Sequence, residues 1–462
     1  MATSPKTTGA RLGPRALALK DEVHRLVVDV VDLSRVDRMP PERLRSEVAE
    51  LAQRLAPQVD RRISTADIER ISDEVIAEVF GLGPLEPLLA DRAVTEILVN
   101  APDQIYYERD GRLHRADAAF VDRAHLTRVI QRIASRIGRR IDESSPMVDA
   151  RLPDGSRVNA VLPPITLDGP VLAIRRFGLN LGVNELIASA SATPEMFVLL
   201  RAAVSARTNI LISGGTGAGK TTLLNILSAF IPDSERLVTI EDAAELRLRQ
   251  PHVVRMETRS ANLEGYGQVT PRDLLRNALR MRPDRIIVGE VRGPEVIDML
   301  QAMNTGHEGS LTTVHANDTR DALSRLELMI GLSGIELPLG VMRNYVGSAI
   351  QLIVHLSRLA GGARRVTRVS ELLGVSRKTK AYRVRDIFRF DQEGVVRGAA
   401  AGVFRATGHV PALLARLDAA GFPVPESLFA ARDLLQVLPP AEELDGTDTD
   451  GAPDLDPEGG GR

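Results

Sequence analysis

A glycine-rich segment at residues 214–221 has the residue types needed to hold a phosphate group. It runs Gly-Gly-Thr-Gly-Ala-Gly-Lys-Thr and matches the pattern G-x-x-x-x-G-K-[ST]. The glycines allow backbone N–H groups to turn inward on phosphate oxygens, and a helix starting near Lys220 directs the positive end of its dipole at them. Lys220 supplies a charge for the phosphates and Thr221 a hydroxyl ligand for Mg²⁺. The predicted nucleotide site comprises Gly214, Gly215, Thr216, Gly217, Ala218, Gly219, Lys220, Thr221 and Thr222.

The sequence around this segment favours a phosphate-binding loop over an accidental glycine-rich turn. An apolar strand is predicted at 209–213 and a helix at 221–230, which is the order that the motif requires. We therefore predict nucleotide binding.

Two acidic positions downstream could provide the hydrolytic chemistry. Glu290 follows the apolar residues 286–288, at the end of a predicted core strand. Ligands of parallel sheets bind at the carboxyl ends of strands, so Glu290 is placed to order Mg²⁺ or polarise an attacking water. Glu241 and Asp242 end an earlier strand and form a second candidate element of this kind. The alternatives are a surface acid for Glu290 and helix capping for Glu241.

Two of the eight histidines, His307 and His315, lie in the segment TGHEGSLTTVHAN. Two imidazoles at this spacing without cysteine make a poor zinc site. We expect them to form hydrogen bonds near the γ-phosphate, where they would report on the nucleotide. The alternative is a histidine in the core or at a subunit contact.

The composition fits a soluble globular protein and weighs against several classes of function. Cysteine is absent, which excludes disulfides and thiol nucleophiles. The net charge of −2, 3% aromatic residues and absence of Trp weigh against nucleic-acid binding. No apolar run approaches the ~18 residues of a membrane span, and no secretory signal is apparent. We expect a cytoplasmic protein whose membrane contact passes through partners.

The elements that must position these residues fall into several segments. Residues 1–14 and the acidic tail 439–462 are expected to be disordered, and residues 15–80 to be helical. A compact α+β domain is expected at 81–180. Strands alternate with helices over 181–398, which predicts an α/β domain with a doubly wound, mainly parallel sheet. Residues 399–438 are expected to form a C-terminal helical extension.

Four motifs in order resemble those of the secretion ATPase superfamily: GGTGAGKTT, TIEDAAEL, RMRPDRIIVGEVRG and TGHEGSLTTVHAN. They are similar to its Walker A, Asp box, atypical Walker B and His box. The segments GLGPLEPLLADRAVTEILVN and RLPDGSRVNAVLPPITLDGPVLAIRRF most resemble the tight-adherence pilus (Tad/CpaF) branch. The resemblance covers roughly residues 75–400. It implies a RecA-like P-loop NTPase domain preceded by a smaller PAS-like α+β domain.

The resemblance also implies an activity and partners. Lys220 and Thr221 would hold ATP and Mg²⁺, Glu290 would be the catalytic carboxylate and a metal neighbour, and Glu241 would belong to the Asp box. His307 and His315 would belong to the His box. The family forms hexamers in which arginines of the N-terminal domain reach the phosphates; here the candidates are Arg157, Arg175 and Arg176, with Arg151 a weaker one. The implied partners are inner-membrane platform proteins, with the motor peripheral to the inner face of the cell membrane.

Several alternatives share parts of this pattern. A type IV secretion motor for conjugation or effector export would use the same chemistry on another cargo. A RecA-like nucleic-acid motor is disfavoured by the missing basic excess. A nucleotide-gated switch without hydrolysis would have little need of Glu290 and Glu241, and no second-substrate pocket of a small-molecule kinase is recognisable.

Overall fold

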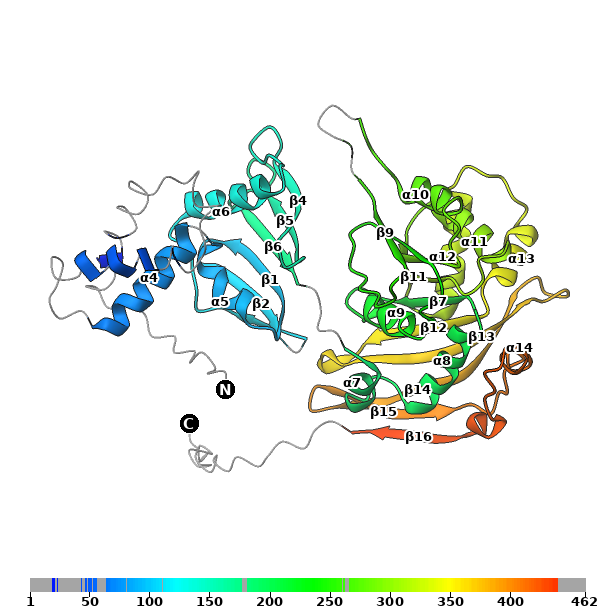
Figure 1. Ribbon diagram of the computed structural model, residues 1–462. Helices are drawn as coiled ribbons and strands as arrows, with labels where there is room; N and C mark the ends of the chain where they lie inside the picture. Colours follow the sequence, from blue (N-terminus) through cyan, green and yellow to red (C-terminus); the bar gives the residue numbers. More distant parts are fainter. Residues whose placement is uncertain are drawn as a thin grey trace, which may run out of the picture.

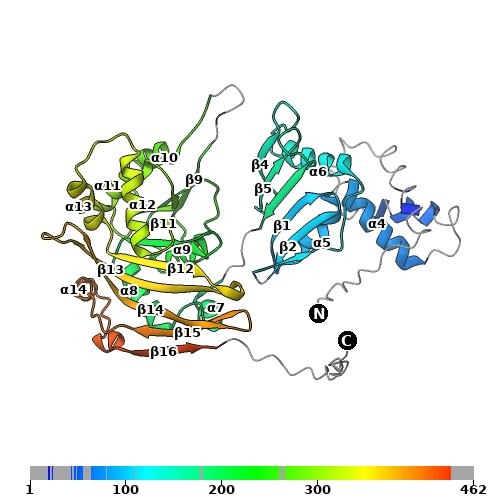
Figure 2. The ribbon, with the colours of Figure 1, turned by 180° about the vertical axis from the view of Figure 1, so that it is seen from behind.

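A computed structural model describes residues 64–79, 81–109, 111–176, 181–259, 261 and 266–438, together with scattered residues between 19 and 55. It consists of an N-terminal domain, up to residue 176, and a C-terminal domain from residue 181. Figures 1 and 2 show them side by side from the front and from behind. The predictions for 1–14 and 439–462, and for most of 15–63, lie outside the described residues.

The N-terminal domain is built on a six-stranded antiparallel sheet with the strand order β3-β2-β1-β6-β5-β4. The strands alternate buried and more exposed residues, as expected when one sheet face is covered. That face packs on α6, whose N-cap Asp122 accepts a hydrogen bond from the backbone N–H of His125. The elements are α4 (Thr65–Val79), η1 (Gly83–Leu85), α5 (Glu86–Ala90), β1 (Val94–Ala101), β2 (Gln104–Arg109), β3 (Arg112–Arg115), α6 (Arg123–Arg136), β4 (Met147–Arg151), β5 (Arg157–Val161) and β6 (Val171–Arg175).

The other face of this sheet is turned towards the C-terminal domain. In both ribbon views α6 lies on the side away from that domain, and β4, β5 and β6 lie on the near side. Alternate residues of a strand point to opposite faces, so the polar residues of β4, β5 and β6 share the near face. The sheet therefore presents a row of charged side chains to the C-terminal domain.

The C-terminal domain contains a ten-stranded sheet with the order β16-β15-β14-β13-β12-β7-β11-β10-β8-β9. From β12 to β9 neighbouring strands are parallel, and from β12 to β16 they are antiparallel. The strands are β7 (Ile210–Gly214), β8 (Leu237–Glu241), β9 (Val253–Glu257), β10 (Arg285–Val291), β11 (Leu311–His315), β12 (Leu352–Arg358), β13 (Arg364–Val375), β14 (Tyr382–Val396), β15 (Ala399–Ala406) and β16 (Arg432–Val437).

Helices cover both faces of the parallel part of this sheet. Strands β7 and β8 are buried at every residue because their two faces pack on different helices. One apolar cluster joins the sheet to α8 and α9, and a second joins it to α10, α11, α12 and α13. The expected α/β, doubly wound architecture is confirmed. The helical elements are α7 (Val183–Ala188), α8 (Pro194–Ser205), α9 (Lys220–Ser228), α10 (Pro271–Ala278), α11 (Glu295–Asn304), α12 (Thr319–Gly331), α13 (Leu339–Ala349), η2 (Ala360–Gly362), α14 (Leu414–Ala419) and η3 (Glu426–Phe429).

The predicted helical extension at 399–438 is wrong. This segment adds β15 and β16 to the edge of the sheet and contains one short helix, α14, and the 3-10 turn η3. The run Ala399–Ala406 is rich in a good helix former, but β14 offers it a complete row of backbone partners. Pairing with β14 outweighs intrinsic propensity here.

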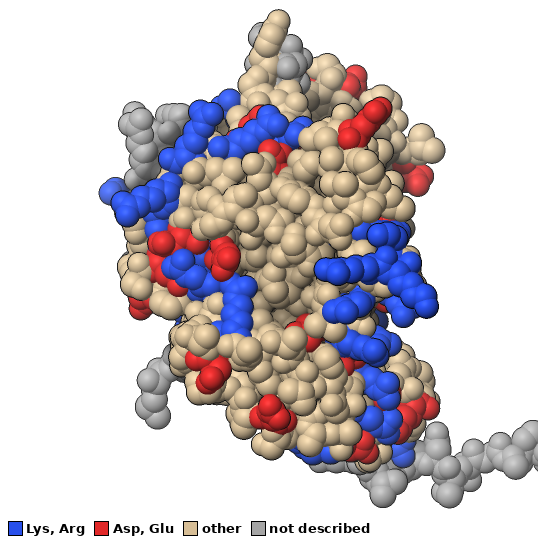
Figure 3. All heavy atoms as spheres, turned by 90° about the vertical axis from the view of Figure 1, so that its right-hand side faces the viewer, with Lys and Arg blue, Asp and Glu red and all other residues tan. Residues whose placement is uncertain are grey.

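The surface away from the N-terminal domain carries charges of both signs. Figure 3 shows Lys and Arg side chains in separate clusters around a broad neutral area, with Asp and Glu side chains among them. None of the helices within the described ranges combines the length and apolar character of a bilayer span.

Candidate active site

The predicted phosphate loop connects β7 to α9 at the carboxyl edge of the parallel sheet. Gly214 has no space for a side chain, since a Cβ there would lie 2.5 Å from the carbonyl oxygen of Leu356. Gly219 caps α9 with a φ of 97°, a conformation that favours glycine. The loop thus delivers the N-terminus of α9 to an anion with its backbone N–H groups exposed.

Lys220 is folded back onto the loop. Its Nζ donates hydrogen bonds to the carbonyl oxygens of Gly214 and Gly215, each at 3.0 Å. Burial lowers the pKa of Lys220; the negative charge of Glu290 opposes this shift, and the positive charges of Arg292 and Arg175 add to it. The charges that act on the loop lysine therefore include a carboxylate from β10 and an arginine from the N-terminal domain.

Glu290, near the end of β10, belongs to a small charged network at the same edge of the sheet. Its carboxylate accepts a hydrogen bond from Arg292 Nη2 at 2.6 Å, and the other arm of Arg292 lies 3.4 Å from Asp242. Burial raises the pKa of Asp242, while the charges of Arg292 and Arg157 counteract the rise. Arg292 was not predicted, although its place two residues after Glu290 was visible in the sequence.

Glu241, the last residue of β8, is 4% exposed and packs against Gly289. Its Oε1 accepts the backbone N–H groups of Glu245 and Leu246 at 2.7 and 2.8 Å, so this oxygen organises the following loop. The alternative prediction of helix capping is wrong, because residues 242–252 form a loop that leads to β9. Its Oε2 is buried and has no hydrogen-bond partner. Such an orphaned acceptor is costly, and it is suited to a ligand, a metal or a water that completes the site.

We predict that Glu241→Gln separates stability from activity. Burial raises the pKa of Glu241 above its ordinary value, partly offset by the two backbone hydrogen bonds. When folding raises the pKa of a carboxyl group, that group contributes to the free energy of unfolding in its protonated form. Its contribution is complete below the unfolded-state pKa and is lost as pH rises through the folded-state pKa. Melting curves from pH 4 to 8 should therefore show the variant gaining stability relative to wild type as pH rises, while its ATPase rate falls at least about tenfold. A variant equally active, or less stable at every pH, would contradict this role.

The two histidines lie at opposite ends of β11. His315 ends the strand, pairs with Gly214 of β7, and is followed by Ala316, whose N–H donates to the Gly214 carbonyl at 3.3 Å. His307 lies four residues before β11, at the end of the sheet where β7 also begins. The two strands are joined there by a hydrogen bond from the Ser310 N–H to the side chain of Asn209, the residue before β7. The prediction that His307 lies near the γ-phosphate is wrong, because the phosphate loop occupies the other edge of the sheet.

A buried histidine that was not predicted stands behind the loop. His355 of β12 is 3% exposed, and its Nδ1 lies 2.9 Å from the hydroxyl of Ser213, the residue before Gly214. Burial lowers the pKa of His355, against the nearby charges of Asp318 and Asp321. No sequence motif marks His355, because only the pairing of β12 with β7 brings it to Ser213.

Three of the four candidate arginines form a row across the N-terminal sheet. Arg151 pairs with Arg157, and Arg157 pairs with Arg175, in the strand register. Arg151 reaches the C-terminal domain directly: it donates to the Ala244 carbonyl at 3.2 Å and lies 3.0 Å from Glu257. Directly opposite residues share one face of a sheet. Arg157 and Arg175 therefore share the face that Arg151 brings against the C-terminal domain.

The fourth candidate, Arg176, has a different place. Its Nη1 donates to the carbonyl oxygens of Asp91 and Val94 inside the N-terminal domain. The prediction that Arg176 reaches the phosphates is not supported, because its guanidinium is engaged by its own domain. The ion pairs that Arg157 and Arg175 make are long, 3.6 Å to Asp149 and 3.7 Å to Glu96, and the two side chains remain 44% and 53% exposed.

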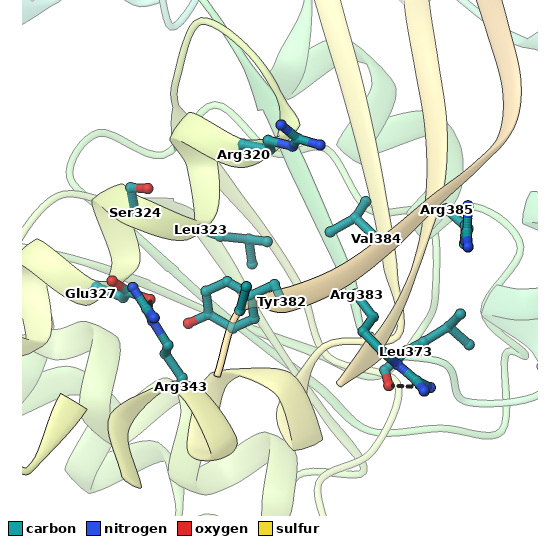
Figure 4. A pocket seen from close by; sticks show the side chains of 11 residues that line it. Arg320, Leu323, Ser324, Glu327, Arg343, Leu373, Tyr382, Arg383, Val384 and Arg385 are labelled. Carbon is teal, nitrogen blue, oxygen red and sulfur yellow. Dashed lines mark hydrogen bonds and ion pairs between the residues drawn. The ribbon is translucent and has the colours of Figure 1, made fainter. Parts of the chain in front are cut away.

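A cavity of about 660 Å³ lies apart from this edge, between α12, α13 and the β13–β14 hairpin (Figure 4). Arg343 and Glu327, paired at 2.8 Å, stand beside the Tyr382 ring. Burial, reinforced by the charge of Glu327, raises the pKa of Tyr382 far above its ordinary value. No phosphate-loop residue lines this cavity, so it is separate from the nucleotide site.

The arrangement at the carboxyl edge fits a nucleotide with Mg²⁺. No group of three or more His, Asp or Glu side chains within the described ranges could hold a metal alone. Mg²⁺ needs no such group, because it is commonly held by one or two protein oxygens together with substrate phosphates. Thr221, Glu290 and the orphaned Oε2 of Glu241 are the oxygens that would hold it.

A phosphate loop between a central strand and a helix, with carboxylates at the ends of two further parallel strands, defines a P-loop NTPase of the RecA-like class. The chain belongs to the family described as type II/IV secretion system protein, which matches residues 78–392.

Several individual proteins are similar to this chain. A putative conjugal transfer protein of Mycobacterium tuberculosis (strain H37Rv) is 41% identical over 316 residues, covering 66% of this chain and 89% of the relative. The type IV secretion system protein VirB11 of Bartonella quintana is 32% identical over 64% of this chain and 93% of its own length. Among solved structures, the VirB11 ATPase of the Brucella suis type IV secretion system in complex with sulphate is 31% identical, covering 62% of this chain and 91% of that chain, with a TM-score of 0.34.

Proposed function

We propose that this chain is an ATP-hydrolysing hexameric motor that powers assembly of a tight-adherence or type IV-like pilus, or secretion across the bacterial inner membrane. The observation that carries the proposal is that Lys220, at the start of α9, and Glu290, near the end of β10, lie at the same carboxyl edge of the parallel sheet. The arginine row of the N-terminal domain meets this edge through Arg151. Phosphoryl transfer needs this combination of a positioned phosphate, a carboxylate that can act as a base on the attacking water, and extra positive charge.

In the proposed reaction each side chain has a separate task. The loop N–H groups and Lys220 hold the phosphates, and Thr221 supplies a hydroxyl to the metal. Mg²⁺, when held there, would neutralise charge on the phosphate oxygens. Glu290 accepts the proton of the attacking water, while Arg175 or Arg157 stabilises charge developing on the γ-phosphate. Closure of the N-terminal domain over the phosphates would turn hydrolysis into motion.

Type IV secretion is the second candidate function. Relatives named as conjugal transfer and type IV secretion proteins favour it, including the conjugal transfer protein TrbB of Rhizobium radiobacter. A protein partner is supported over a nucleic acid by the net charge of −2 and by the mixed charges of the surface in Figure 3. We propose a cytoplasmic motor, peripheral at the inner face of the cell membrane and bound to inner-membrane platform proteins.

Steady-state hydrolysis and light scattering test the proposal together. We expect the purified chain to hydrolyse ATP and to elute as a hexamer when ATP is present. Tight ATP binding without turnover in any assembly state would instead indicate a nucleotide-gated switch. Deletion of the gene should abolish pili if the pilus assignment is right, and conjugation or effector export if the type IV assignment is right.

A further inference from the structure

A buried carboxylate of the N-terminal domain faces the phosphate loop from the side opposite Arg151. Glu108 lies on β2, in the same cross-strand row as Glu96 and Arg175, and is 7% exposed. Within its own domain it accepts a hydrogen bond from the Thr95 hydroxyl at 3.0 Å. Its charge partners, Arg358 and Arg364, belong to the C-terminal domain. The Nη2 atom of each arginine donates to a carboxylate oxygen of Glu108 at 3.3 Å.

Arg364 connects this carboxylate to the phosphate loop. Its Nη2 donates to Glu108, and its Nε donates to the carbonyl oxygen of Gly217 at 2.9 Å. The guanidinium is planar and its donors have fixed relative directions, so a shift of one acceptor displaces the other. One rigid group therefore spans from the N-terminal domain to the middle of the loop that holds the phosphates.

A second contact fixes the place where the domains meet. Arg358 donates to the carbonyl oxygen of Gly111 at 2.6 Å, and the backbones of Gly111 and Gly362 lie against each other. A Cβ on Gly362 would come within 3.1 Å of the Gly111 oxygen. Both glycines have positive φ, 76° and 81°, so neither tolerates a side chain easily. This contact holds Glu108 beside Arg364.

We propose that Glu108 is a positioning residue that couples the phosphate loop to the N-terminal domain through Arg364. Phosphate in the loop engages its N–H groups, and the accompanying change in the peptide at Gly217 is passed through Arg364 to Glu108. Glu108 is at one end of the cross-strand row, and Arg151, at the other end, is bound to the C-terminal domain. A movement of Glu108 therefore rotates the sheet about Arg151 and shifts Arg157 and Arg175, which lie between them, over the phosphates. The inference rests on the proposed function, because it describes how the same site is assembled.

The first test measures domain movement directly. The chain has no cysteine, so cysteines at the exposed positions Glu143 and Lys378 accept a donor–acceptor dye pair without background labelling. Labelled protein is mixed with excess unlabelled protein, so that an assembly contains one labelled subunit and energy transfer takes place within that subunit. A nonhydrolysable ATP analogue should change energy transfer in otherwise unmodified protein. Glu108→Gln should reduce that change to roughly half or less while the analogue still binds with similar affinity.

The second test asks whether Glu108 and Arg364 act as one unit. Glu108→Gln and Arg364→Gln should each lower kcat by roughly 3- to 30-fold with little change in KM, and the double variant should be no worse than the more impaired single one. Glu327→Gln is the matched control, since Glu327 also pairs with an arginine, Arg343, at 2.8 Å but lies away from the loop. It should leave kcat and energy transfer unchanged.

The outcomes separate this inference from the proposed function. Normal kcat and a full energy-transfer change in Glu108→Gln would overturn the coupling while leaving the motor intact. Additive losses in the double variant would also overturn it, because independent effects would then explain both residues. If unsubstituted protein neither hydrolyses ATP nor responds to the analogue, the motor assignment itself fails. Melting temperatures of all variants identify any loss that comes from unfolding.

Discussion

Arg175→Ala is expected to slow ATP hydrolysis by roughly 10³- to 10⁵-fold while leaving the fold intact. Its guanidinium is about half exposed and its 3.7 Å ion pair with Glu96 is long, so the side chain can reach a phosphate. Its positive charge also contributes to lowering the pKa of Lys220 in the phosphate loop. A thousandfold loss corresponds to about 4 kcal/mol of transition-state stabilisation, a reasonable loss for one charged donor in a closed site.

Steady-state kinetics of a small panel of arginine variants will identify the arginine that stabilises the γ-phosphate. Arg157→Ala should have a smaller effect, since the charge of Arg157 acts on Asp242 instead. Arg175→Lys should recover part of the rate, because it restores the charge without the planar fork. Arg112→Ala, an exposed arginine on the same sheet, serves as the control. If Arg157→Ala is the more damaging variant, the assignment moves to Arg157; if neither variant slows hydrolysis, neither Arg157 nor Arg175 touches the phosphates.

Glu290→Gln is expected to retain ATP binding and to lose hydrolysis by roughly 10²- to 10⁴-fold. The amide has nearly the same shape but cannot accept a proton from water. Arg292 keeps a carboxylate partner in the variant, since Asp242 lies 3.4 Å from its other arm, so the site should keep its geometry. Isothermal titration with ATP and single-turnover hydrolysis would measure the two effects separately.

Asp242→Asn is the matched control for this prediction. Asp242 is also paired with Arg292, and burial raises the pKa of Asp242. It differs from Glu290 in its place, because it follows β8 whereas Glu290 is on β10. We expect Asp242→Asn to reduce kcat by less than about tenfold. Hydrolysis that survives in Glu290→Gln but disappears in Asp242→Asn would exchange the roles of these two carboxylates.

The phosphate loop and Glu290 were predictable because their signals are local. The loop lies within eight consecutive residues, and its flanking strand and helix follow from nearby apolar patterns. Glu290 follows a short apolar strand, and the carboxyl ends of parallel strands meet at one edge. The same reasoning placed Glu241 at that edge. It did not indicate that one of its oxygens organises a loop while the other is left without a partner.

The arginines and histidines show where local reasoning stops. Arg175 and Arg176 are neighbours in sequence, but the alternation of a strand sends them to different surroundings. His307 and His315 occupy one motif, yet β11 lies between them. One histidine is therefore at the amino end of this strand and the other at its carboxyl end. Choosing within each pair needed the strand boundaries and the direction of the strand.

The sequence by itself determined an α/β domain, the place of its glycine-rich loop between a strand and a helix, the place of Glu290 near the end of another strand, and a smaller domain ahead of it. Only the tertiary structure decided which distant residues meet: His355 with Ser213, Glu108 with Arg364, and residues 399–406 with β14. The physical reason is that a motif is encoded by neighbours along the chain. A contact between distant residues depends instead on strand register and on how the domains pack, and many residues jointly set both.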